Sequence, residues 1–155
     1  MVRRVNEPTV CFLMCFRPVR CSMFVHPCPR ALNKVAHYSE RQIQKLASDP
    51  AIIRNRMKIE AAVRNARAFL KIQEEFRDFD SYCWRFVGGR PKLNHWKATR
   101  QIPATSPESD AFSKDLKHQG FSFVGPTVVY AYMQAVGMVN DHLVECFRYR
   151  EVGKA

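Results

Sequence analysis

The amino-acid sequence predicts an all-α fold. Apolar residues recur at helical spacing over residues 59–70, capping residues precede several segments, and glycines follow them. No segment shows the alternation of apolar and polar residues that is typical of a half-buried strand. The chain of 155 residues suits one domain, and its apolar content of 46% is sufficient for a core.

Two helices are expected first in this domain. Ser39 and Gln42 form a capping box for a short helix that ends at Ala47. Asp49 and Pro50 then give a start signal for the longest helix, as a cap and a first-turn residue. The apolar stripe of that helix consists of Ile59, Ala62, Val63, Ala66, Phe69 and Leu70.

Two more helices are expected in the middle of the chain. One spans residues 79–87 and ends at two glycines, and a loop over residues 90–105 follows it. Ser106 begins the next helix, which Gly120 ends.

The last part of the chain is also predicted to be helical. A helix that opens at Pro126 is interrupted by Gly137. Asn140 or Asp141 can cap a final helix that continues through Phe147.

The charge of the chain indicates a polyanionic partner. Its 25 basic and 14 acidic residues give a formal net charge of +11. Nucleic acid is the first candidate and an anionic membrane surface the second, although a basic protein without such a partner would look the same. The longest apolar run, Val10 to Phe16, is far short of the roughly 20 residues that cross a bilayer. We therefore expect a cytoplasmic protein without a membrane association.

Residues 1–34 differ in composition from the rest. They contain four of the six cysteines, four prolines and one acidic residue, Glu7, and they show no sustained periodicity. This crowding of cysteines does not resemble a secreted disulfide scaffold. The sequence predicts an irregular segment over residues 1–34, a helical domain over residues 35–149 and a tail over residues 150–155.

The segment between the helices near residue 120 indicates a phosphate-binding hairpin. Two glycines flank a short apolar turn, and glycine allows positive φ and a close backbone approach to a phosphate. Backbone N–H groups at the start of the following helix can bind an anion, although Pro126 lacks a backbone N–H. An ordinary turn between two helices has the same pattern. The candidate DNA-binding residues are Lys117, Gly120, Phe121, Ser122, Phe123, Val124, Gly125 and Thr127, of which Phe121, Phe123 and Val124 are expected to anchor the turn in the core.

His142 and Cys146 are the candidate metal ligands. They are four residues apart on a predicted helix and so would share one face, which suits two ligands of a tetrahedral zinc ion. Two ligands form only half of a structural site. A packed cysteine and a hydrogen-bonded histidine are the alternative interpretation.

Other residues give weaker signals. Trp84 and Trp96 offer rings that stack on a base, although Phe79, Tyr82 and Cys83 beside Trp84 have the spacing of core residues. Asp141 has two interpretations, a catalytic carboxylate or, more simply, a helix cap. The sequence assigns no catalytic residue.

Taken together, several segments resemble the DNA-3-methyladenine glycosylase I family. They are residues 49–56 (DPAIIRNR), 58–59, 65–67, 84–89, 103–116 (PATSPESDAFSKDL), 120–125 (GFSFVG) and 132–149, the last containing VNDH at 139–142. The resemblance spans residues 35–149 in order. It implies a helix-hairpin-helix glycosylase that flips 3-methyladenine out of double-stranded DNA and hydrolyses its N-glycosidic bond in base-excision repair.

The resemblance also implies a cofactor and a domain boundary. Members of the family hold zinc with a Cys and a His near the N-terminus and a C-terminal His-x-x-x-Cys, which His142 and Cys146 match. The family's base pocket, its other zinc ligands and a Glu that reads the base lie in an N-terminal part that residues 1–34 do not match. We therefore expect an N-terminally incomplete, monomeric domain with a zinc half-site and little or no excision activity. The alternatives are a non-catalytic DNA-binding module and an unstable fragment.

Overall fold

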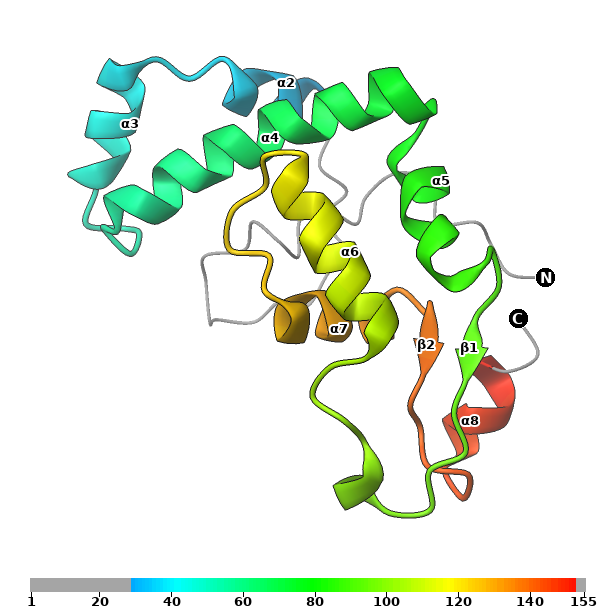
Figure 1. Cartoon of the computed structure of the whole chain (residues 1–155). Helices are drawn as coiled ribbons and strands as arrows, with labels where there is room; N and C mark the ends of the chain where they lie inside the picture. Colours follow the sequence, from blue (N-terminus) through cyan, green and yellow to red (C-terminus); the bar gives the residue numbers. More distant parts are fainter. Residues whose placement is uncertain (1–28, 153–155) are drawn as a thin grey trace.

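The computed structural model describes residues 29–152, and this part of the chain is mainly helical, as predicted (Figure 1). The sequence predictions for residues 1–28 and 153–155 lie outside it. The elements in chain order are α2 (Pro29–Ala36), α3 (Glu40–Ala47), α4 (Arg56–Phe76), α5 (Phe79–Trp84), the 3-10 turn η1 (Arg85–Val87), β1 (Lys92–Leu93), the 3-10 turn η2 (Thr99–Gln101), α6 (Pro107–His118), α7 (Pro126–Ala135), β2 (Val139–Asn140) and α8 (Phe147–Val152).

The long helix α4 joins two parts of the fold. Its first half packs against α3 through a small apolar cluster of Ile43, Ile59 and Val63. Its second half packs against α2 and α5, and its buried face there contributes Phe69 and Ile72 to the main core. Figure 1 shows α4 running along α2 and α3, with α6 beneath it.

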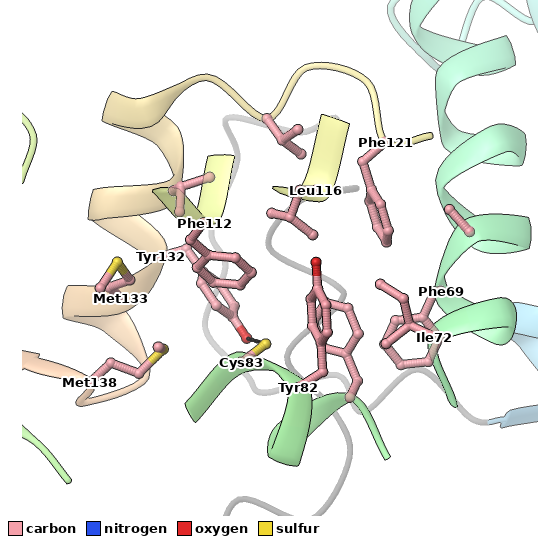
Figure 2. Close-up of a cluster of buried hydrophobic side chains, with 14 of the residues drawn as sticks. Phe69, Ile72, Tyr82, Cys83, Phe112, Leu116, Phe121, Tyr132, Met133 and Met138 are labelled. Atoms are coloured by element: carbon pink, nitrogen blue, oxygen red, sulfur yellow. Dashed lines mark hydrogen bonds between the residues drawn. The ribbon is translucent and has the colours of Figure 1, made fainter. Parts of the chain in front are cut away.

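The main core is rich in aromatic side chains from α4, α5, α6 and α7 (Figure 2). Phe112 of α6 has no exposed surface and stacks on Phe86, with ring centroids 4.4 Å apart. Tyr82 of α5 is equally buried, and its hydroxyl donates to Asp115 at 2.7 Å. Because such rings bury large areas, this cluster provides the main hydrophobic stabilisation of the domain.

Most helix signals in the sequence are confirmed, but the start of α4 is not. Asp49 does not cap it: its Oδ1 accepts from the N–H of Ala51 at 2.8 Å and forms a local turn. The helix begins at Arg56 instead, and the side chain of Asn55 caps it by accepting from the N–H of Lys58.

Three further features differ from the sequence prediction. The expected loop over residues 90–105 contains β1, which pairs in parallel with β2 over two residues each. Helix α2 continues across the predicted boundary between residues 34 and 35. The segment from residue 141 to 146 is not helical, and α8 begins only at Phe147. The parallel pair occupies the backbone of residues 139 and 140, so no helix starts there.

Within the described residues, no helix is long and apolar enough to span a membrane.

Candidate nucleic-acid interface

The hairpin between α6 and α7, residues 120–125, has the geometry that its glycines suggest. Gly120 adopts φ +94°, a conformation that favours glycine, and ends α6. The N–H of Phe121 returns to the carbonyl of Leu116 at 2.9 Å, which closes the last turn of that helix. Gly125 is the N-cap of α7, and Pro126 takes its first position. The chain therefore reverses within six residues.

Two of the three predicted anchors of the hairpin are confirmed. Phe121 and Val124 are buried in the main core, with 4% and 1% of their surface exposed. Ser113 of α6 adds a hydrogen bond from its hydroxyl to the carbonyl of Val124, at 2.6 Å. The prediction for Phe123 is wrong. It is 52% exposed and adopts φ +60°, so the turn directs its ring outward.

The start of α7 presents free donors next to the hairpin. Among the described residues, the backbone N–H groups of Val124, Gly125 and Thr127 have no hydrogen-bond partner. They belong to the N-terminus of a ten-residue helix, where backbone donors and the helix dipole both favour an anion. Lys117 at the end of α6 is exposed and adds positive charge. This geometry suits a DNA phosphate.

Asp141 accepts four hydrogen bonds and connects separate parts of the fold. Its Oδ1 accepts from the side chains of Asn94 and Trp96, both at 2.7 Å. Its Oδ2 accepts from the Tyr130 hydroxyl at 2.6 Å and the Gln134 amide at 2.7 Å. With both oxygens occupied twice, the carboxylate has no acceptor site left for a water or a substrate proton. It is neither a helix cap nor a free general base here.

The electrostatics of Asp141 follow from this arrangement. Burial alone raises the pKa of a carboxyl group, but the four donors to Asp141 outweigh burial and lower its pKa. The pKa of Tyr130 is raised, first by burial and then by its bond to this carboxylate. The four hydrogen bonds therefore favour the charged form of Asp141, which has a structural role.

His142 and Cys146 converge, although not on a helix as predicted. They lie in the loop between β2 and α8, with Sγ of Cys146 3.8 Å from Nδ1 of His142. Zinc–sulfur and zinc–nitrogen bonds of about 2.3 and 2.0 Å at tetrahedral angles put two such atoms roughly 3.6 Å apart. The 3.8 Å contact is a hydrogen bond between the two side chains, as in the alternative interpretation, and the separation is also close to that of two ligands of one zinc ion. Over residues 29–152, no group of three or more metal-ligating side chains is found.

The residues considered for base stacking and their neighbours are buried or half-buried. Phe79, Tyr82 and Cys83 are buried, as their spacing predicted. The indole of Trp84 donates to Asp80 at 2.9 Å, and that of Trp96 donates to Asp141. Both tryptophans are half-buried, and their indole N–H groups bind carboxylates of the protein itself.

The sequence analysis includes Asn65 in the segment 65–67 that resembles the family, but it does not predict that this residue of α4 contacts the hairpin. Its Oδ1 accepts from the N–H of Ser122 at 2.8 Å, and its Nδ2 donates to the carbonyl of Ser122 at 3.0 Å. A polar residue beside Ala66, on the buried face of a predicted helix, is a further signal for a buried contact.

Comparison with known proteins places this geometry in a family. The family described as methyladenine glycosylase matches residues 30–149. DNA-3-methyladenine glycosylase 1 of Escherichia coli (strain K12) is 43% identical over 116 residues, which are 75% of this chain and 62% of that protein. DNA-3-methyladenine glycosylase of Haemophilus influenzae is 38% identical over 114 residues, 74% of this chain and 62% of that protein.

Solved structures similar to this chain belong to the same kind of enzyme. A crystal structure of 3-methyladenine DNA glycosylase I has a TM-score of 0.70 and 40% identity, covering 75% of this chain and 64% of that one. A variant of such an enzyme in complex with 3-methyladenine has a TM-score of 0.71 and 33% identity, covering 75% and 62%. The chain spans 62% of the length of the curated relatives that it matches. With its helix-hairpin-helix architecture and this extent of similarity, the chain belongs to the methyladenine glycosylase family.

Proposed function

We propose that this chain binds double-stranded DNA that carries alkylated bases and acts as a DNA-3-methyladenine glycosylase. The observation that carries the proposal is the hairpin 120–125, in a family named for this activity. Its backbone donors at the start of α7 have no partner within residues 29–152. The reaction would hydrolyse the N-glycosidic bond of a flipped 3-methyladenine. The net charge of +11 supports attraction to the DNA backbone.

Release of the free base is the direct test. The purified chain is incubated with methylated duplex DNA, and released 3-methyladenine is quantified by chromatography, beside a full-length relative. We expect specific release at a rate well below that of the relative, because residues 1–34 do not match the part of the family that holds the base pocket. An absence of base release would overturn the proposed glycosylase activity, and an absence of DNA binding as well would overturn the proposed partner.

The competing function is a non-catalytic DNA-binding module. The saturated hydrogen bonding of Asp141 removes only this carboxylate as a proton acceptor and does not by itself favour the alternative. Binding of duplex DNA that weakens steeply with salt, without base release, is the outcome that supports it.

We propose further that His142 and Cys146 form a zinc half-site of low affinity. The two side chains lie within hydrogen-bond distance, 3.8 Å, so they can reach one ion together. The other candidate ligands lie outside the described residues; they are Cys11, Cys15, Cys21, His26 and Cys28. Two protein ligands leave half of the tetrahedral shell to water, so binding should be weak.

Dialysis against a mild chelator tests the zinc prediction. We expect zinc added to the purified chain to be removed, and H142A and C146S to abolish the binding that remains at high zinc concentration. Stoichiometric zinc that survives dialysis would show that further ligands complete the site.

Two further proposals concern the oligomeric state of the chain and its compartment. We propose that the chain is a monomer, to be measured by sedimentation equilibrium, and that it acts in the cytoplasm.

A further inference from the structure

Asn65 makes a two-point contact with the backbone of one hairpin residue. Only 3% of its surface is exposed, and both ends of its amide are used on Ser122, one accepting and one donating. Arg64, its neighbour in α4, donates to the Ser122 hydroxyl at 3.3 Å. A buried amide that satisfies both backbone groups of a loop residue 57 positions away in sequence fixes the orientation of that peptide.

The contact lies beside a conformation that needs support. Phe123 follows Ser122 and adopts φ +60°, which is costly for a bulky residue and persists only where its surroundings hold it. Asn65 holds the residue before Phe123, and Ser113 holds the carbonyl of Val124 after it. The turn at Phe123 is thus fixed from α4 on one side and from α6 on the other.

This turn determines where the free donors of the hairpin point. The unpartnered N–H groups of Val124 and Gly125 follow Phe123 directly, so a different peptide orientation at residues 122 and 123 would aim them elsewhere. We propose that Asn65 is a positioning residue, which pre-organises the hairpin backbone for a phosphate group of duplex DNA. The inference rests on the proposed function, because it takes DNA as the partner of the hairpin.

Two substitutions test the contact, with a control on the same helix. N65A removes both hydrogen bonds. N65D keeps the shape and the acceptor for the Ser122 N–H, but it turns an oxygen towards the Ser122 carbonyl, where Asn65 donates. V63A removes apolar packing from the separate cluster of Ile43, Ile59 and Val63, which tests for a general decrease in stability.

DNA affinity is the first measurement, at a temperature where circular dichroism shows every variant to be folded. We expect N65A and N65D to weaken binding to duplex DNA by about tenfold, because the hairpin is no longer pre-organised. The dependence of affinity on salt should also weaken. For each phosphate contact that a variant loses, the slope of log affinity against log salt should decrease in magnitude by about one. V63A should stay within about twofold of the parent chain because it does not touch the hairpin.

Amide hydrogen exchange of the DNA-free chain is the second measurement, and it separates a local change at the hairpin from a general loss of stability. In N65A, the Ser122 amide should exchange faster, by about tenfold, while the amides of Phe121 and Val129, which donate to Leu116 and Gly125, should keep their rates relative to the parent. A uniform increase at all three amides would contradict local positioning.

The two measurements separate failure of this inference from failure of the proposed function. If the parent chain does not bind DNA, the proposed function fails, and the inference fails with it even when Ser122 exchange changes as expected. If the parent chain binds and N65A and N65D bind equally well, the hairpin needs no positioning by Asn65 and the inference alone is overturned.

Discussion

Replacement of Asp141 by asparagine should destabilise the domain by about 3 kcal/mol, because hydrogen bonds to a buried charge are each worth roughly 1.5–3 kcal/mol. An amide of the same shape keeps one acceptor oxygen, but its NH₂ group would face two of the four donors that Asp141 now satisfies. These donors come from Asn94, Trp96, Tyr130 and Gln134, and two of them would be left without a partner in a partly or fully buried setting. Urea unfolding followed by circular dichroism measures the difference.

An exposed aspartate gives the matched control for D141N. Asp110 lies in the first turn of α6 and is exposed, so D110N should cost no more than about 0.5–1 kcal/mol through the helix dipole. A D141N variant that is as stable as D110N would show that the four hydrogen bonds contribute nothing to the free energy of folding.

The same carboxylate predicts a dependence of stability on pH. Its pKa is lowered in the folded state, so its stabilising contribution is complete above the pKa of an unfolded aspartate, about 3.9. That contribution is lost as the pH falls through the lower pKa of the folded state. The stability difference between the parent chain and D141N should therefore be constant near neutral pH and shrink in strong acid. A difference that grows as the pH falls below about 4 would contradict the assignment.

The local features of the fold were predictable because their causes lie within a few residues. The capping box of Ser39 and Gln42 and the Ser106 cap of α6 hold in the structure. The helix ends predicted at the glycines near residues 88 and 120 are also confirmed. Glycine adopts the positive φ found there without steric cost, so the residue itself is the signal. Asp49 shows the limit of local signals, because an aspartate before proline equally favours the turn that it makes with Ala51.

The candidate site was predictable only where its residues are contiguous. The hairpin could be found as a segment of the sequence, and family resemblance identified it. Asn65, however, meets Ser122 across 57 positions, and Asn94 meets Asp141 across 47. Such contacts depend on how helices pack, so spacing along the chain carries no signal for them. His142 and Cys146 were paired correctly for a wrong reason, because a loop after β2 brings them together instead of a helical turn.

Truncation of Phe112 to alanine should cost about 3–5 kcal/mol, the usual range for a large aromatic residue in a packed core. Phe112 has no exposed surface and lies beside Tyr82 and Tyr132 in the core (Figure 2). It makes T-shaped contacts with these two rings, with centroids at 5.9 and 6.2 Å, and it stacks on Phe86. Because domains of this size are stable by about 5–15 kcal/mol in total, F112A should lose a large part of its stability. The shift of the urea midpoint measures that loss.

Phe147 provides the matched control for F112A, because it is an exposed phenylalanine. It is 76% exposed at the start of α8, so F147A should change the free energy of unfolding by no more than about 0.5 kcal/mol. Phe112 also precedes Ser113, whose hydroxyl holds the carbonyl of Val124 in the hairpin. F112A should therefore speed amide exchange around the hairpin as well as in the core, whereas F147A should leave both unchanged. Equal stability of the two variants would mean that the aromatic cluster around Phe112 is not the core that stabilises this domain.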